Sequence, residues 1–174
     1  MGYYSYLSNS QKSGFSFELG SVLINNSFVF LCVGNSNVVA DCFGPLVGEL
    51  LIKQYGLKNV VGCLSHNITK KNLNNEINCI KQKYKNCKIV VVDAALGNIE
   101  NVGYINLLNS GCVPACATST LTVGDVSILG ITNVVGIDNL MFLKTTRFNM
   151  VLSMAKFVAN NIFNSVELLK KLSN

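Results

Sequence analysis

Apolar residues along this chain form short continuous runs that alternate with sets spaced as on one face of a helix. Residues 28–33 form a continuous apolar run, and residues 44–55 carry apolar side chains three and four positions apart. The same order recurs at 60–64 and 73–84. Continuous runs rich in β-branched residues are typical of buried strands, whereas the three-to-four spacing is typical of amphipathic helices. The pattern therefore predicts two successive strand–helix units.

The most apolar run, KIVVVD at residues 88–93, predicts the central strand of a sheet. An uninterrupted row of Ile and Val suits a strand of a parallel sheet that is covered on both faces. Further strands are expected at 104–108 and 126–131, and a long amphipathic helix at 147–172. Alternating strands and helices predict an α/β fold, a three-layer α/β/α sandwich around a mostly parallel mixed sheet.

The domain organisation follows from where this pattern begins. Residues 1–20 are rich in Ser, Asn, Tyr and Gly without clear periodicity, so we expect a partly ordered N-terminal arm there and one α/β domain over 21–174. The longest apolar runs are far shorter than the roughly 20 residues that cross a bilayer. The first residues lack the features of a secretory signal. We therefore expect a cytoplasmic protein without a membrane partner.

Cysteine and charge patterns exclude several classes of function. The seven Cys are an odd number and several lie in apolar segments, which favours reduced thiols. Cys112 and Cys116 form a C-x-x-x-C pair with no second pair or His at zinc-site spacing, so a metal role is not expected. The net charge of +5 comes from scattered Lys without interleaved aromatics, which argues against nucleic-acid binding. His66, the sole His, lies in a polar loop and is expected on the surface.

The best candidates for chemistry are two of the four Asp residues. Asp93 ends the most buried strand, and Asp41 follows the first strand by a short loop. Ligands of open parallel sheets bind beyond the carboxyl ends of the strands, so both carboxylates should face one crevice. Taken singly, Asp93 could cap a turn and Asp41 could cap a helix. If the two carboxylates lie close together, they either share a proton or hold a cation, and either arrangement can activate water for hydrolysis.

Other polar residues are expected to support this pair. Asn35 and Asn37 follow the first strand, where their amides can hold the carboxylates and also form the turn. Asp125 and Ser127 begin a later strand, and they either line the same crevice or end the preceding loop. Asp138 is expected on the far side of that strand. No G-x-S-x-G elbow occurs, and the loop at Gly34 lacks the further glycines of a dinucleotide site, so neither a serine hydrolase nor a nucleotide cofactor is expected.

Two ordered motifs carry a resemblance to known families. GNSNVVADCFGPLVG at 34–48 resembles the G-N-x-N-V-x-x-D-x-x-G-P segment of the spore germination protease, and VVVDAALG at 90–97 resembles the second Asp segment of that family. The chain is still more similar to the family of the sporulation protein YyaC, through GPLVG, DAALG and VGDVSILGITNVVG, over about residues 28–160. The resemblance implies a hydrolase-like fold shared with hydrogenase maturation endopeptidases. It also implies a site at Asp41 and Asp93, with Gly44 as a supporting residue.

Departures from these relatives leave two functions open. The maturation enzymes add a His in a later loop, but SGCVPACATST at 110–120 has none, so no cofactor is expected on that plan; a divalent cation between Asp41 and Asp93 stays open. One function is an aspartate-dependent peptidase that hydrolyses a protein substrate during sporulation or germination, in the mother cell or forespore. The other is a catalytically silent spore protein that binds a partner or assembles. It is motivated by the missing His and by ACATSTLTVGD at 115–125, where Ala and Thr replace glycines expected from the resemblance. Oligomeric state is not indicated by the sequence.

Overall fold

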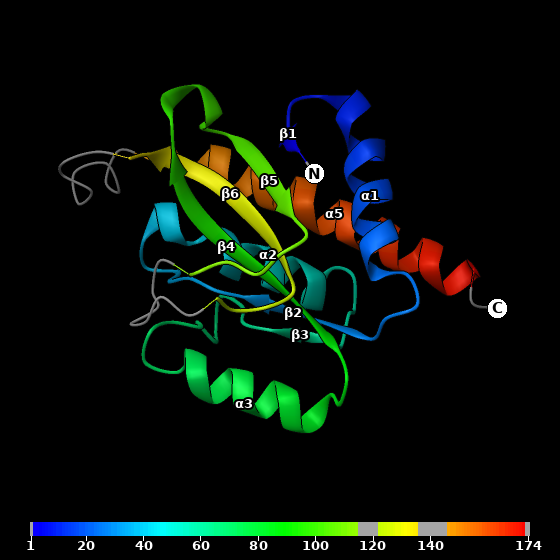
Figure 1. The fold of residues 1–174 in the computed structure, drawn as a ribbon. Helices are drawn as coiled ribbons and strands as arrows, with labels where there is room; N and C mark the ends of the chain where they lie inside the picture. The colour runs from blue at the N-terminus through cyan, green and yellow to red at the C-terminus, as the bar shows by residue number, and fades with distance from the viewer. Residues whose placement is uncertain (1, 115–121, 136–145, 173–174) are drawn as a thin grey trace.

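The computed structural model describes residues 2–114, 122–135 and 146–172, which form a six-stranded sheet covered by helices on both faces (Figure 1). The strands lie in the order β1-β5-β6-β4-β2-β3. Their bounds are Tyr3–Ser5 for β1, Phe28–Cys32 for β2, Val60–Val61 for β3, Lys88–Gly97 for β4, Tyr104–Leu108 for β5 and Val126–Val134 for β6. The helices are Asn9–Leu23 for α1, Phe43–Lys53 for α2, Leu73–Lys83 for α3 and Phe148–Leu172 for α5, with single 3-10 turns at Val39–Asp41 (η1) and Ile99–Asn101 (η2).

The predicted mixed, mostly parallel sheet is confirmed. β4 is parallel to β2 on one side and to β6 on the other, and β3 continues the parallel part beyond β2. β5 and β1 are antiparallel and complete the other edge. Ile89 to Val92 is almost completely buried because helices cover both faces of β4, which explains its uninterrupted Ile-Val-Val-Val sequence.

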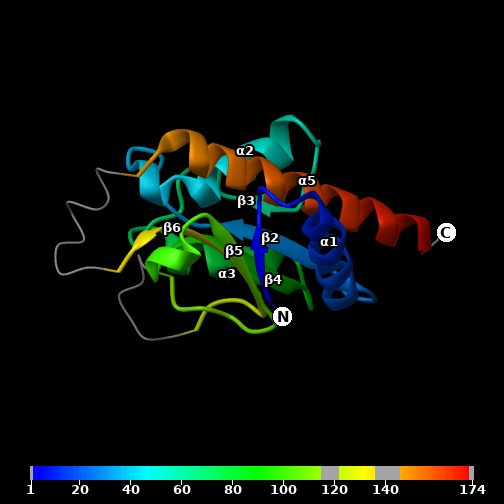
Figure 2. The same ribbon diagram turned by 90° about the horizontal axis from the view of Figure 1, so that it is seen from above.

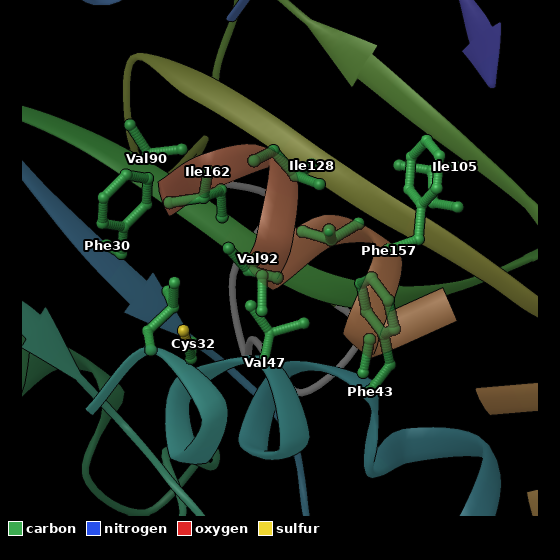
Figure 3. Packing of buried hydrophobic residues seen from close by; sticks show 14 of the residues in the cluster. Phe30, Cys32, Phe43, Val47, Val90, Val92, Ile105, Ile128, Phe157 and Ile162 are labelled. Carbon is green, nitrogen blue, oxygen red and sulfur yellow. The ribbon is translucent and has the colours of Figure 1, made fainter. Parts of the chain in front are cut away.

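The helices divide unequally between the two faces. α1, α2 and α5 cover one face, and α3 covers the other (Figures 1 and 2). On the first face, the even-numbered β4 residues Val90 and Val92 pack with Val47 of α2 and Ile162 of α5 (Figure 3). The odd-numbered residues of β4 face α3, because successive side chains of a strand point to opposite faces. These layers confirm the predicted α/β/α sandwich.

The prediction of a partly ordered arm at residues 1–20 is wrong. This segment forms β1, which pairs with β5, and most of α1. Phe15, Leu19 and Leu23 follow one another at four-residue intervals and are almost completely buried in the main core. Ser, Glu and Gly between them hide this spacing in the sequence. The helix is stabilised by packing against α5, which local composition does not reveal.

The described cysteines are all free thiols, as the sequence predicts for Cys32, Cys63 and Cys79; Cys116 lies outside the described residues. Cys32 is buried in the core, whereas Cys79 is exposed. Among the helices of the described residues, none is long and apolar enough to span a membrane.

Candidate active site

One candidate carboxylate lies within β4, which continues past the predicted end at Asp93 to Gly97, and the other follows its parallel neighbour β2. Each residue of β2 pairs in register with β4, up to Cys32 beside Val92. The last hydrogen bond between these strands runs from the Val33 N–H to the Val92 carbonyl oxygen at 2.8 Å. Asp93 is the next residue of β4, and Asp41 follows β2 by a loop of eight residues that ends in η1. The strands that carry the two carboxylates are thus adjacent, as the sequence predicts.

The loop after β2 closes on itself and brings Asp41 back to the end of the strand. The Asn35 N–H donates to the backbone oxygen of Asp41 at 3.2 Å, and the Asn37 N–H donates to Asn35 Oδ1 at 3.0 Å. Gly34 has a φ of +138°, and a Cβ there would lie 2.1 Å from the same Asp41 oxygen. Asn35 and Asn37 therefore act in the turn, and Gly34 permits the close approach that this turn requires.

Gly44 allows α2 to begin directly over the ends of β2 and β4. A Cβ at this position would lie 2.0 Å from the Val33 carbonyl oxygen and 2.7 Å from that of Val92. The neighbouring residue, Phe43, places its ring against Gly130 of β6, whose partner in β4 is Ala94. The segment that follows Asp41 is therefore packed against the part of the sheet that contains Asp93.

Burial alters the acidity of Asp41. The carboxyl is partly buried, and burial raises its pKa from 3.8 to about 6, while a hydrogen bond from the Asn35 backbone acts in the opposite direction. A carboxyl with a pKa of about 6 exchanges its proton readily near neutral pH. Asp41 is therefore suited to general acid–base chemistry.

Asp93 is more deeply buried than Asp41. Only 2 % of the residue is exposed, and Oδ1 accepts a hydrogen bond from the Ala94 N–H at 2.9 Å. Its position in β4 places the side chain on the sheet face that carries Val91. Burial of a carboxylate at this depth costs folding free energy unless the carboxylate is hydrogen-bonded. Deeply buried acidic residues are therefore candidates for a functional role.

Cys112 is a neighbour of Asp93 that sequence analysis assessed only as a zinc ligand. Burial raises the pKa of the Cys112 thiol, a hydrogen bond with Ser127 lowers it, and the charge of Asp93 raises it. Cys112 comes close because it pairs with Val123 across the connection between β5 and β6. No signal in the local sequence indicates this proximity, which depends on that long-range pairing.

The expectation that Asp125 reaches the crevice is wrong. Its carboxylate accepts from the Ile89 N–H at 2.8 Å, and its own N–H donates to the Ile89 oxygen at 2.8 Å. Ile89 lies near the start of β4, four residues before Asp93. Asp125 thus lies at the amino end of the parallel strands, opposite the edge where Asp41 and Asp93 follow them.

The remaining candidates lie in different places. Ser127 is completely buried and donates to the Ser110 carbonyl oxygen at 2.8 Å, so it holds the chain just before Cys112. Asp138 lies outside the described residues. His66 is exposed, as expected, and forms an ion pair with Glu76 when protonated. Among the described residues, no group of three or more His, Cys, Asp or Glu side chains is arranged to hold a metal ion.

The raised pKa of Asp41 predicts a pH-dependent contribution to stability. Burial favours the protonated carboxyl, so its stabilising contribution is complete below pH 3.8 and is lost as pH rises through about 6. Relative to wild type, Asp41→Asn should therefore gain more unfolding free energy at about pH 7.5 than at about pH 4. Urea unfolding at both pH values measures this difference, and a difference independent of pH would contradict the assignment.

The position of Asp125 predicts a structural role that is separable from activity. Asp125→Ala removes the acceptor for the Ile89 N–H, so the free energy of unfolding should fall by about 1–2 kcal/mol. Any activity that depends on Asp41 and Asp93 should be retained at temperatures where the variant is folded. Urea unfolding and an activity assay on the same preparation test both expectations, and loss of activity in a fully folded variant would argue against this separation.

Comparisons with known proteins agree with this architecture. The family model described as "Protein of unknown function (DUF1256)" matches residues 4–161. The chain is 34 % identical over 138 residues to the "Uncharacterized protein YyaC" of Bacillus subtilis (strain 168), covering 77 % of this chain and 67 % of that protein. The crystal structure of a [NiFe] hydrogenase maturation protease HycI from Thermococcus kodakarensis KOD1 is similar in fold, with a TM-score of 0.55 and 17 % identity over 86 % of this chain and 99 % of that one.

Proposed function

Because the chain belongs to a family described only as of unknown function, we propose its activity from the site itself: an aspartate-dependent peptidase that hydrolyses a protein substrate at Asp41 and Asp93. The protease-like fold supports a protein as the substrate class. The two motifs that resemble the spore germination protease contain these same two residues.

One observation carries the proposal: two carboxylates that are withdrawn from solvent lie where the pairing of the parallel strands β2 and β4 ends, Asp93 within β4 and Asp41 after β2. The carboxyl edge of the parallel strands is where ligands of open α/β sheets bind. Asp125, by contrast, lies at the opposite end of the strands and accepts backbone hydrogen bonds there. Asp125 therefore differs from Asp41 and Asp93 both in its position along the strands and in its burial.

The proposed chemistry divides proton transfer between the two carboxyls. Asp93 removes a proton from a water molecule as its oxygen attacks the carbonyl carbon of the scissile amide. Asp41, whose raised pKa of about 6 keeps a fraction of the carboxyl protonated near neutral pH, donates its proton to the departing nitrogen. The C–N bond breaks, and the products are a carboxylic acid and an amine.

A divalent cation between Asp41 and Asp93 is the alternative way to activate the water. The two mechanisms predict different responses to metal removal. With a shared proton, cleavage should be unchanged by excess EDTA, whereas a cation-dependent site should lose activity and recover it when Mg²⁺, Mn²⁺ or Zn²⁺ is added. Initial rates before and after chelation distinguish the two cases.

We propose further that the substrate is a spore protein and that the protein acts inside the mother cell or forespore. The resemblance of 34–48 and 90–97 to segments of the spore germination protease supports this. A sporulating culture provides the test, because deletion of the gene should leave one or more spore proteins uncut. An unchanged set of protein termini in the deleted strain would contradict the assignment to spores.

The direct experiment is substrate identification in vitro. The purified protein is incubated with denatured protein from sporulating cells, and new peptide termini are identified by mass spectrometry. We expect a limited set of new termini that the Asp41→Asn/Asp93→Asn variant does not produce. Equal production of those termini by the double variant would refute the two-aspartate mechanism.

A second function, partner binding without catalysis, is favoured by one surface feature. A shallow depression between α1 and α5 is lined in part by Phe17 and Leu168, which are 76 % and 49 % exposed. Exposed apolar residues grouped in this way are typical of contact sites. Under this alternative, Phe17→Ser/Leu168→Ser abolishes the biological effect while Asp41→Asn/Asp93→Asn leaves it intact.

A further inference from the structure

β4 continues beyond the end of its neighbour β2 (Figure 1). The last bond between the two strands reaches the Val92 oxygen. Among the described strands, β6 is the one that pairs with β4 from Ala94 to Gly97, in a register that runs from Gly130 to Val134. The carboxyl half of β4 is therefore a strand edge on its β2 side, and this edge begins at Asp93.

The direction of the backbone groups along this edge follows from the bonds at each end of β4. The Ile89 and Gly97 carbonyl oxygens accept from Asp125 and Val135, so both face β6, whereas the Val92 oxygen accepts from Val33 and faces β2. Backbone groups of successive strand residues point to alternate sides. Ala94 and Leu96 therefore direct their N–H and C=O groups toward the side where β2 has ended.

In residues 2–114, 122–135 and 146–172, no strand pairs with these edge groups. The Ala94 N–H is bonded instead to the carboxylate of Asp93, the preceding residue. Within the described parts of the chain, no segment supplies a hydrogen bond to the N–H or C=O of Leu96 on this side. Residues 95–97 are also partly exposed, and three of the four edge side chains are Ala or Gly. A second backbone can approach such an edge closely.

The start of the loop after β2 is held away from this edge, whereas η1 at its end contacts β4. The Gly34 N–H donates to the Ile68 oxygen at 2.9 Å, on the side of β2 opposite β4. The Ser36 N–H donates to Asn67 Oδ1 at 3.3 Å, and its hydroxyl donates to the Leu64 oxygen at 3.4 Å. These bonds fix the start of the loop to residues 64–68, so it turns from β4 before Asp41 returns to the strand end.

We propose that the edge of β4 at residues 94–97 binds an extended segment of the protein substrate as an added strand, with the scissile amide beside Asp93 and Asp41. The inference rests on the proposed peptidase function and specifies the form of its substrate. Main-chain hydrogen bonds to the Ala94 C=O and to the N–H and C=O of Leu96 provide the binding, so the recognised chemistry is an unfolded, extended polypeptide. A helical segment, whose backbone groups are already paired, is excluded.

A peptide-binding experiment tests this edge directly. Random linear dodecapeptides displayed on phage are selected on the Asp41→Asn/Asp93→Asn variant, which leaves bound peptides uncut and keeps an oxygen at position 93 for the Ala94 N–H. Leu96→Pro is then added to remove the Leu96 N–H and block the edge, which is tolerated because this N–H faces no strand. Leu96→Ala is the matched control, since it shortens the side chain and keeps the N–H.

We expect the selected peptides to bind Leu96→Ala normally and Leu96→Pro about tenfold more weakly. N-methylation of alternate peptide residues should also weaken binding, whereas methylation of the residues between should not, because only one set faces the edge. The N-methyl series uses the variant without Pro, so it remains decisive if Leu96→Pro does not fold. Failure to select any peptide, equal binding to Leu96→Pro, or no alternation in the N-methyl series would overturn the inference.

The peptidase proposal and the edge proposal fail in different ways. Peptides that bind the edge but are not cut by the wild-type protein would contradict the peptidase function and support the edge. If the wild-type protein and a folded Leu96→Pro variant cut a substrate at the same rate, the edge proposal would be contradicted and the peptidase function supported.

Discussion

Asp93→Asn is expected to lower kcat/KM for peptide cleavage about a thousandfold, the scale of a general acid–base group. The amide of Asn cannot take a proton from water, yet its Oδ1 still accepts from the Ala94 N–H, so the strand should keep its local hydrogen bond. Asp41→Asn should have a loss of similar size, because it removes the proton donor. Initial rates on the substrate identified from spore protein, at about pH 6 to 7, measure both effects.

The losses of kcat/KM caused by Asp41→Asn and Asp93→Asn should be strongly non-additive. When two groups act on one water molecule, removal of either one disables the reaction, so the double variant should be little worse than each single variant. Asp125→Asn is the matched control because it changes a carboxylate at the other end of the same strands. Wild-type rates in a folded Asp93→Asn variant would exclude the role assigned to this residue.

Gly44→Ala is expected to cause the largest loss of stability among the substitutions considered, about 3 kcal/mol or more. The new methyl group would meet two backbone oxygens, at 2.0 Å on Val33 and 2.7 Å on Val92, which belong to the central strands and cannot shift cheaply. To relieve the contact, α2 must move away from the strand ends. Because Asp41 lies just before α2, activity should also fall at temperatures where the variant is folded.

Gly20→Ala provides the comparison for this prediction. Gly20 lies in α1, and a Cβ there would have no atom within 4 Å. Alanine restricts the unfolded chain and favours a helix, so this variant should be about 0.5–1 kcal/mol more stable than wild type. Urea unfolding curves measure both changes. A Gly44→Ala variant as stable as wild type would show that α2 does not depend on this close approach.

Much of the site could be predicted because its geometry follows from strand order and direction. The apolar runs at 28–33 and 88–93 predict parallel strands, and residues that follow parallel strands lie at the carboxyl edge of a sheet. Asp41 meets this condition, whereas Asp93 lies within β4, at the point where the pairing with β2 ends. Asp125 precedes its strand, so the same rule places it at the amino edge; the expectation that it joins the crevice neglected that direction.

The sequence by itself determined the alternation of strands and helices, the burial of residues 89–92 and the position of Asp41 after a strand, since each depends on local periodicity. Only the tertiary structure decided that residues 9–23 form a helix, because α5 supplies the apolar surface that Phe15 and Leu19 cover. It alone placed Cys112 near Asp93, through the pairing with Val123. It also decided that β4 extends beyond the end of β2, which leaves a strand edge beside the carboxylates. Strand length and register depend on contacts between segments far apart in the chain, which local periodicity does not encode.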